Sequence, residues 1–439
     1  MTTFAVYFGM KTTKAPILAF FFLFLFGLSV KGQDYPWLKN NNFMVEARGH
    51  FGFFYHHHFE MERFTKSYGA FEASFYQNTY GRNEWEAIYN YPYIGVTYYT
   101  SGLGHFNEAP AKLGRVHALY PFINYPLIRS EYAQLTFKLG IGLAYLTEHF
   151  DQFDNFYNFS IGSHLNAAAN LSFEYRQKIT PRFTAVASFG LTHFSNGSTK
   201  LPNYGLNTIS GALGIAYYLR DPRLLLTPAK RPEYHPFEFD KKKWFSMELD
   251  YGIGFKNVSQ TLGGDSIYYT VHDLSTRFLA QFTQCSRAGL GFSLVLDLSD
   301  QTLPDHGCDS LGKYVRVRNA DGTSKKEYFN SVFEMTKPHL SLCYAMTMNR
   351  MSFYFEFGWP LKFSDKTDLS KGNLFQKVSC KYQIYDNIYA NLSLMTHYGR
   401  ADYLCFGIGY RFNQKYYLNH EKRTRRIPPG LRKRSLLFL

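Results

Sequence analysis

Alternating apolar and polar residues recur along most of this chain, and no other feature constrains its fold as strongly. Runs of about 10 to 16 residues follow one another from Phe43 to Phe412, separated by polar residues or by clusters of Gly, Pro, Asn and Asp. We count roughly sixteen such runs, and none has the periodicity of an amphipathic helix. Successive side chains of a strand point to opposite sides of a sheet, so each run predicts a strand with one apolar face.

The run 132–146 shows the alternation clearly. Its apolar face carries Leu135, Phe137, Leu139, Ile141, Leu143 and Tyr145. Its other face carries Gln134, Thr136, Lys138, Gly140, Gly142 and Ala144. Small and polar residues on one face are typical of a barrel of about eight strands, whose lumen only just holds side chains.

The composition places these strands in a membrane. Aromatic residues make up 19% of the chain, with 36 Tyr and 43 Phe, although the mean hydropathy is −0.29. No segment after residue 32 predicts a transmembrane helix, so a membrane protein of this kind must satisfy its backbone in a closed sheet. The remaining 400 or so residues could form about two or three ordinary domains. The aromatic content instead favours an all-β fold, an antiparallel transmembrane β-barrel of the bacterial outer membrane.

The first 32 residues predict a secretory signal peptide. Lys11 and Lys14 precede an apolar run from Ile17 to Leu28, and small residues in "SVKGQ" offer a cleavage point. This run is shorter than the stretch of about 20 residues that a spanning helix needs. We therefore expect residues 1–32 to be removed.

A Pro-rich and basic stretch divides the rest of the chain. Residues 221–243 are longer than the usual periplasmic turn of a barrel and predict a linker. Eight strand-like runs precede it in 43–220, about eight follow in 244–412, and a basic tail occupies 413–439. Two arrangements stay open: tandem barrels of about eight strands each, or one wide barrel of about fourteen to sixteen.

Three polar residues interrupt the lipid-facing side of two neighbouring runs. In the run 182–196 the apolar face continues into His193 and Ser195, and Asn207 lies in phase with the apolar face of the next run. A polar group turned toward hydrocarbon costs a few kcal/mol unless it is satisfied or lies near the interface. One interpretation is that the strand leaves the bilayer at Leu191. The other is that the imidazole takes the serine proton while the asparagine orients the ring.

The stretch "HFSNGSTKLPNYGLN" resembles the signature of the PagL-type lipid A 3-O-deacylases, outer-membrane esterases that remove an ester-linked acyl chain from lipid A. The family pattern is His, any residue, Ser and Asn, followed by Pro-Asn and a Gly before the next strand. This chain matches it at His193, Ser195, Asn196, Pro202, Asn203 and Gly205. The resemblance extends loosely over 43–220, with the motif on the seventh of eight strands, and makes this unit a deacylase-like barrel. The second half is not covered, although its ending "THYGRADYLCFGIGY" is similar to that of longer acyloxyacyl hydrolases.

The resemblance implies a role for each matched residue. Ser195 would be the nucleophile and His193 its general base, while amides around Asn196 and Asn203 would stabilise the oxyanion. Where the family has a glutamate, this chain has Asn207. An amide can fix the tautomer of the imidazole but cannot stabilise an imidazolium as a carboxylate does, so we expect a slower enzyme.

The strand direction suits a lipid A substrate. If Phe43 begins the first strand at the periplasm, odd strands run outward and the motif faces the leaflet that lipid A occupies. Lys200 is a candidate contact for a lipid A phosphate, and a solvated loop lysine is the simpler interpretation. We predict an outer-membrane carboxylic ester hydrolase whose partners are lipopolysaccharide and outer-membrane lipids, with no cofactor and no metal. A homodimer is left open. The alternative function is a non-catalytic barrel, for transport or structure, that retains the motif.

Other candidate motifs predict less. Three consecutive histidines, His56 to His58, would point to alternate faces of a strand and so could not converge on one metal ion. His397 repeats the position of His193 within "MTHYGR", but its parity turns it inward and no serine follows two residues later. We interpret it as structural or pore-lining.

The cysteine spacing and the charge distribution argue against a zinc site and a nucleic-acid site. The cysteines lie in the second half, at Cys285, Cys308, Cys343, Cys380 and Cys405. They show no CxxC pair and no zinc spacing, and an odd count predicts at least one thiol that is free or paired with another molecule. The net charge of +14 is raised by the tail segment 422–434, which we interpret as a solvated tail and not as a nucleic-acid site.

Overall fold

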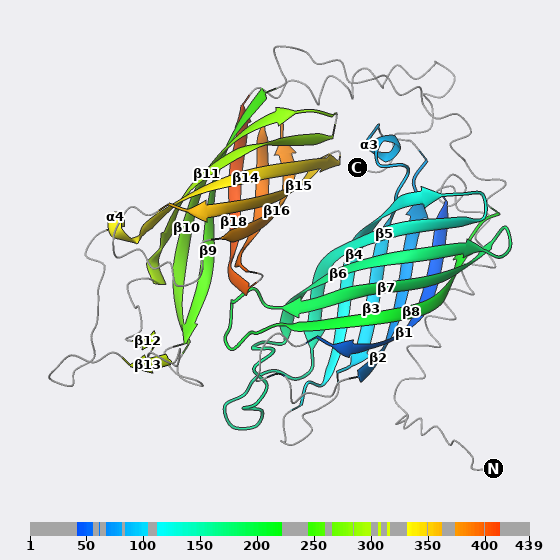
Figure 1. Ribbon diagram of the computed structural model, residues 1–439, viewed down its shortest axis with the longest axis horizontal. Coiled ribbons are helices and arrows are strands. Elements are labelled where there is room, and N and C mark those ends of the chain that lie inside the picture. Colours follow the sequence, from blue (N-terminus) through cyan, green and yellow to red (C-terminus); the bar gives the residue numbers. More distant parts are fainter. Residues whose placement is uncertain are drawn as a thin grey trace.

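Two closed eight-stranded barrels follow each other along the chain (Figure 1). The computed structural model describes residues 42–55, 61, 67–80, 84–103, 112–221, 245–259, 266–283, 285–299, 306–308, 314–316, 332–348, 350–361, 374–398 and 400–412. The predicted signal peptide, the predicted tail, the three consecutive histidines and all but the first residue of the predicted linker lie outside the described residues.

The first barrel contains eight antiparallel strands in chain order. They are β1 (Phe43–Phe54), β2 (Ser67–Asn78), β3 (Tyr93–Gly102), β4 (Arg115–Arg129), β5 (Ala133–Leu146), β6 (Leu165–Lys178), β7 (Phe183–Ser195) and β8 (Leu206–Tyr218). A short helix, α3 (Glu84–Ile88), lies between β2 and β3. The barrel closes by itself, because β1 pairs with β8, with Met44 opposite Tyr218.

The second barrel also has eight strands and closes where β9 pairs with β18, with Met247 opposite Phe412. Its strands are β9 (Phe245–Ser259), β10 (Ser266–Gln281), β11 (Ser286–Asp297), β14 (Thr336–Met348), β15 (Met351–Pro360), β16 (Phe375–Tyr385), β17 (Ile388–His397) and β18 (Arg400–Phe412). The hairpin of β12 (His306–Cys308) and β13 (Tyr314–Arg316) and the short helix α4 (Val332–Met335) lie between β11 and β14. Of the two arrangements that the sequence left open, the tandem barrels are observed and the single wide barrel is wrong.

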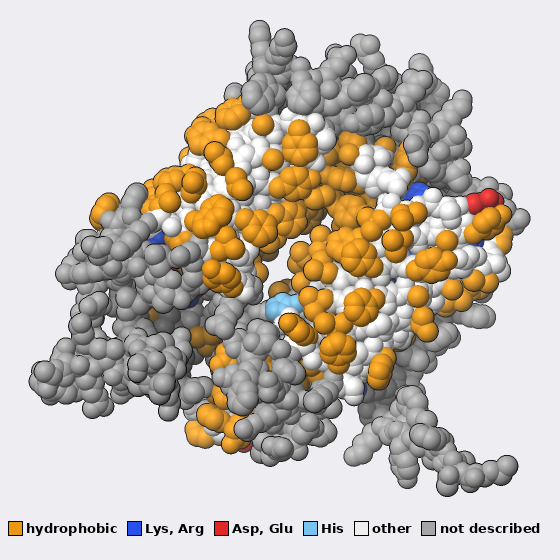
Figure 2. All heavy atoms as spheres, viewed as in Figure 1, with side chains coloured by type: hydrophobic (Ala, Val, Ile, Leu, Met, Phe, Trp, Pro, Cys, Tyr) orange, Lys and Arg blue, Asp and Glu red, His pale blue; other side chains and the backbone are white. Residues whose placement is uncertain are grey.

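The outer faces of both barrels are apolar, as the alternation predicted. Large exposed side chains include Phe51, Leu143, Phe189 and Leu213 on the first barrel and Ile253, Leu290, Phe406 and Ile408 on the second. Figure 2 shows such side chains spread over the visible face of both barrels. An apolar surface of this extent suits the hydrocarbon of a bilayer. The helices within the described residues lack the length and apolar character needed to cross a membrane.

Paired charges close the lumen of the first barrel. Lys138 Nζ lies 2.5 Å from Glu72 Oε1. Arg48 and Arg176 lie 2.6 Å and 2.9 Å from the two oxygens of Glu174. Each of these side chains is at most 3% exposed. Removing an ion from water costs several kcal/mol, so such charges are retained only when each has a partner. The network therefore both fills the lumen and joins strands on opposite walls.

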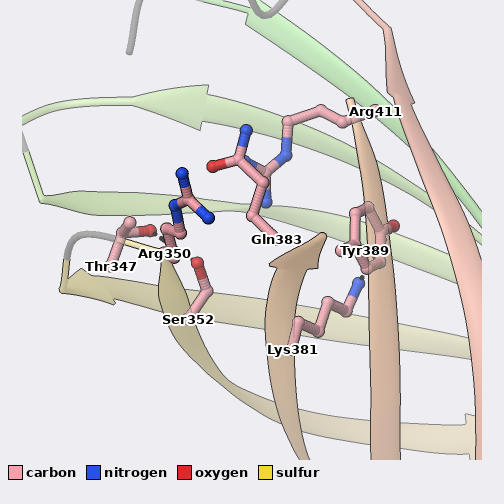
Figure 3. Close-up of a pocket in the computed structure, with 7 residues that line it drawn as sticks. All are labelled: Thr347, Arg350, Ser352, Lys381, Gln383, Tyr389 and Arg411. Carbon is pink, nitrogen blue, oxygen red and sulfur yellow. Dashed lines mark hydrogen bonds between the residues drawn. The ribbon is translucent and has the colours of Figure 1, made fainter. Parts of the chain in front are cut away.

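The lumen of the second barrel is closed in the same way. Arg277 pairs with Glu356 at 2.6 Å, and Lys381 pairs with Glu248 at 2.9 Å. Figure 3 shows Lys381 aimed at the ring of Tyr389, whose centroid lies 4.6 Å from Nζ. The cavity that these side chains help to line has a volume of about 10 Å³, enough for a single water molecule. Within the described residues, buried ion pairs thus occupy both lumens.

Four cysteines have described side chains: Cys285, Cys343, Cys380 and Cys405. Cys343, Cys380 and Cys405 are free thiols, and Cys285, Cys343 and Cys405 are buried. The prediction of at least one free thiol is confirmed.

Candidate active site

Strands β7 and β8 bring His193 and Asn207 together. The two residues are direct partners across the antiparallel pair, and His193 Nδ1 lies 2.6 Å from Asn207 Oδ1. An amide oxygen can only accept, so Nδ1 carries the hydrogen and Nε2 keeps its lone pair. Both side chains lie in the register of the exposed Phe189, on the outer face of the barrel. The imidazole is thus held in a tautomer whose free nitrogen can accept a proton.

Two donors converge on the hydroxyl of Ser195, the last residue of β7. The Gly197 amide donates to Ser195 Oγ at 3.2 Å, and Asn203 Nδ2 donates to it at 2.8 Å. Ser195 is 7% exposed. Residues 183–207 are all described, and no hydrogen bond among them joins the hydroxyl to His193. The expected contact between imidazole and hydroxyl is therefore not formed in this arrangement.

The loop between β7 and β8 is ordered by its own asparagines. Asn203 Oδ1 accepts from the Asn196 amide at 3.2 Å, so Asn203 bridges the start of the loop and Ser195. Asn196 Nδ2 donates to the Lys200 carbonyl at 2.7 Å and to Ser163 Oγ at 3.1 Å. Both asparagines of the motif lie at the site, and the Asn196 amide is engaged within the loop.

Gly205 lies directly against the imidazole. Its φ is +77°, and a Cβ added there would lie 2.7 Å from His193 Cε1. Any other residue would strain the backbone and displace the ring. The Gly205 amide donates to the Ser160 carbonyl at 2.9 Å, which fixes this position to the connection between β5 and β6. The glycine of the motif is thus required by the place that His193 occupies.

Lys200 lies in the same loop, beside the connection between β5 and β6. A Cβ added to Gly162 of that connection would lie 2.4 Å from the Lys200 carbonyl oxygen, so the two segments are in close contact. The amides of Asp154 and Phe153 lower the pKa of the Asp151 carboxyl, and the Lys200 ammonium contributes to the same shift. Lys200 therefore lies close enough to the Asp151 carboxyl to contribute to its electrostatic environment.

An apolar groove begins beside the His193–Asn207 pair. Its volume is about 380 Å³, within the range of small-molecule sites. Ile209 follows Asn207 on the same face of β8, about 7 Å farther along the strand. The full lining is Phe51, Gly52, Phe53, Ser67, Phe189, Ile209, Ser210 and Gly211. The groove runs over the outer face of the barrel, where the lack of a side chain at Gly211 leaves room between aromatic rings.

Sequence reasoning did not predict the contacts of Gly197 and Gly205. The Asn-Gly pair at 196–197 is a turn signal that could have drawn attention to Gly197, whereas no local pattern places Gly205 on a ring twelve residues earlier. His397 is directed into the second barrel, with Nε2 3.7 Å from Asp402 Oδ2, as its parity predicted. The described part of the chain holds no cluster of three or more His, Cys, Asp or Glu residues suited to a metal ion.

Two family models match the chain, one on each barrel. Residues 69–216 match the lipid A 3-O-deacylase (PagL) family, and residues 245–414 match the acyloxyacyl hydrolase, C-terminal domain, family. The first match contains His193, Ser195 and the loop to Asn207, and the second contains every strand of the second barrel. No curated protein matches the chain.

Solved outer-membrane barrels match the chain only weakly. Omp33 of Acinetobacter baumannii is 7% identical, with 85% of this chain and 98% of that chain covered and a TM-score of 0.15. A porin mutant of Rh. blastica is 8% identical, with coverages of 84% and 99% and a TM-score of 0.15. The toluene transporter TbuX of Ralstonia pickettii is 8% identical, with coverages of 85% and 90% and a TM-score of 0.16. Similarity at these scores says nothing about function.

Proposed function

The chain belongs to the PagL-type family of outer-membrane lipid A deacylases, and we propose that it hydrolyses an ester-linked acyl chain of lipid A through Ser195 and His193. In this reaction the Ser195 oxygen attacks the ester carbonyl and the lipid A hydroxyl leaves. Water then releases the fatty acid from the acyl-enzyme. His193 takes the proton from each attacking oxygen and returns it to each leaving group.

The observation that carries the proposal is the 2.6 Å hydrogen bond between His193 and Asn207 on the lipid-facing side of the barrel. A polar pair in that register costs a few kcal/mol in hydrocarbon and makes no contribution to the packed lumen. The cost is accounted for if the group that arrives there is a polar lipid ester. Asn207 then keeps the Nε2 lone pair available as the base.

The oxyanion would be stabilised by the donors that now hold Ser195. The Gly197 amide and Asn203 Nδ2 lie about one hydrogen-bond length from Oγ, next to where the carbonyl oxygen of an attacked ester would lie. When the hydroxyl turns toward His193 Nε2, both donors become free for the developing charge. Asn196, whose amide binds Asn203 Oδ1, would serve by orienting Asn203.

The groove and Lys200 supply the rest of a lipid A site. The scissile acyl chain would lie over Ile209 and Gly211, between the rings of Phe51 and Phe189, starting next to the catalytic pair. Lys200, in the loop that follows Ser195, would meet a phosphate of the lipid A headgroup. The groove, the catalytic pair and Lys200 would thus contact the acyl chain, the ester and the headgroup phosphate of lipid A, in that order.

The alternative of a transport barrel is disfavoured by both lumens. In the first, Glu174 and its two arginines are at most 3% exposed, and in the second, Arg277 is fully buried against Glu356. A channel through either barrel would have to break these pairs, at a cost of several kcal/mol for each ion left alone.

A covalent trap tests the nucleophile. The purified full-length chain is treated with a fluorophosphonate, and the modified peptide is identified by mass spectrometry. We expect a single adduct on Ser195 that appears together with loss of hydrolysis of a p-nitrophenyl ester and of lipid A.

Two variants complete this test. Ser195→Ala should abolish both labelling and hydrolysis. Ser188→Ala is the matched control, because Ser188 lies on the same strand but accepts from Arg48 on the lumen side. Labelling of another serine, or hydrolysis that survives Ser195→Ala, would contradict the proposal.

A further inference from the structure

Asn257 interrupts the apolar register of β9 on the second barrel. Leu249, Tyr251, Ile253 and Phe255 alternate along its outer face and are 37% to 50% exposed. Asn257 is the next residue in this register, yet it is 3% exposed. An asparagine pointing away from the lumen is therefore covered, and the cover comes from the first barrel.

The covering segment is the loop between β7 and β8, which carries the proposed active site. The Asn257 amide donates to the Ser198 carbonyl at 3.3 Å, and Asn257 Oδ1 accepts from the Leu201 amide at 3.3 Å. Figure 1 shows this loop reaching the second barrel beside β18. One residue of the second barrel thus binds two backbone positions of the loop.

The neighbouring strands β17 and β18 extend this contact. Ser198 Oγ donates to the Ala401 carbonyl at 2.6 Å. A Cβ added to Gly197 would lie 3.6 Å from Leu394 Cδ1 and 3.8 Å from Leu404 Cβ, which places the turn on the apolar wall of the barrel. Ser198 has a φ of +64°, a conformation that costs a residue other than glycine about 1 kcal/mol. The hydrogen bond to Ala401 offsets that cost.

The residues that the second barrel holds are the ones that carry the donors to Ser195. The Gly197 amide binds Ser195 Oγ directly and is followed by Ser198. Asn203, the other donor, comes two residues after Leu201. A shift of the loop would move both donors relative to the nucleophile, and displacements of about 1 Å at a reacting centre can cost about 100-fold in rate.

We propose that the second barrel completes the active site of the first, with Asn257 as a positioning residue that holds the β7–β8 loop so that Gly197 and Asn203 reach Ser195. This inference rests on the proposed function of that site. It gives the second barrel a part in catalysis without any contact between its side chains and the substrate. The outer face of β9, β17 and β18 is the wall against which the loop is set.

Substitutions at Asn257 in the full-length chain test the proposal. Asn257→Leu keeps the approximate volume and removes the acceptor, so kcat for a p-nitrophenyl ester should fall roughly tenfold or more with little change in KM. Asn257 Nδ2 has no hydrogen-bond partner within the described residues. Asn257→Asp therefore keeps the bond to Leu201 and should restore most of kcat. Rates are normalised to the active sites that a fluorophosphonate titrates.

Asn391→Leu is the matched control, since Asn391 is also a buried asparagine of the second barrel but faces its lumen on β17. Its kcat should equal that of the parent chain. An Asn257→Leu chain that titrates fully and keeps its kcat, or an equal loss in all three variants, would overturn the proposal.

Hydrogen exchange separates this inference from the proposed function. The Leu201 amide should be protected in the parent chain and in Asn257→Asp, and exchange faster in Asn257→Leu. If the parent chain hydrolyses no ester, the proposed function fails. Protection of the Leu201 amide would still show that Asn257 holds the β7–β8 loop. If the Leu201 amide exchanges equally fast in all variants, Asn257 does not hold the loop, whether or not the chain is an enzyme.

Discussion

The partner of His193 is an amide where a carboxylate would be the stronger choice. Asn207 Oδ1 lies 2.6 Å from Nδ1 and fixes the tautomer, which is the part of the orienting role that needs no charge. Stabilising the imidazolium does need charge, and Asn207 supplies none. In the proposed mechanism, proton transfer at this site would therefore receive a smaller electrostatic contribution than in a triad with an acid.

Substitution of Asn207 should separate these two contributions. Asn207→Ala removes the orientation and should lower kcat by roughly 100-fold, whereas Asn207→Asp adds the missing charge and should raise kcat about tenfold, or about 1.4 kcal/mol of barrier. Steady-state turnover of lipid A and of a p-nitrophenyl ester measures both changes. An alanine variant as fast as the parent would show that Asn207 does not orient the base.

Gly205 also determines where the His193 imidazole can lie. Gly205→Ala places a methyl group 2.7 Å from His193 Cε1 at a φ of +77°, so kcat should fall at least about tenfold. Gly49→Ala is the control, because Gly49 lies on the outer face of β1 and an added Cβ there meets nothing within 4 Å. Initial rates on a p-nitrophenyl ester decide the point. Equal rates for both variants would mean that Gly205 does not set the ring position.

Individual strands were well predicted because a period of two identifies the buried face without any knowledge of the partner strand. On β5, the interior positions expected from the sequence include Thr136 and Lys138, which are at most 1% exposed. On β7 and β8, the same parity placed His193 in phase with Asn207, and the two are direct partners. Parity does not reveal which loop residues turn back, so strand parity alone could not predict the contacts of Gly197 and Gly205.

The apolar groove on β1, β7 and β8 should determine how well long acyl chains bind. Gly211→Leu should fill it, because an added Cβ meets only the Ser188 carbonyl oxygen at 3.9 Å and the longer side chain then extends over the outer face. We expect KM for long-chain p-nitrophenyl esters to rise about tenfold while the butyrate ester is hydrolysed as before. A ladder of esters from C4 to C14 measures this. A uniform change across the ladder would place the acyl chain elsewhere.

The sequence could not decide between two barrels and one, because barrel closure depends on the pairing of strands that are distant in the chain. A run of alternating residues is equally compatible with a near neighbour and with a strand far away in the chain. The pairing of β1 with β8 and of β9 with β18 selects two small barrels, each filled by its own ion pairs. The contact between the barrels, where Asn257 of β9 binds the β7–β8 loop, likewise joins segments that are far apart in the chain.

Mass spectrometry of lipid A tests the central claim most directly. Lipid A is extracted from outer membranes that contain the folded chain and compared with lipid A from membranes that contain the Ser195→Ala variant. We predict that the parent chain removes one ester-linked fatty acid, with a corresponding loss of mass, and that the variant leaves lipid A intact. Lipid A of unchanged mass in the presence of the folded parent chain would contradict the assignment of this protein as a lipid A deacylase.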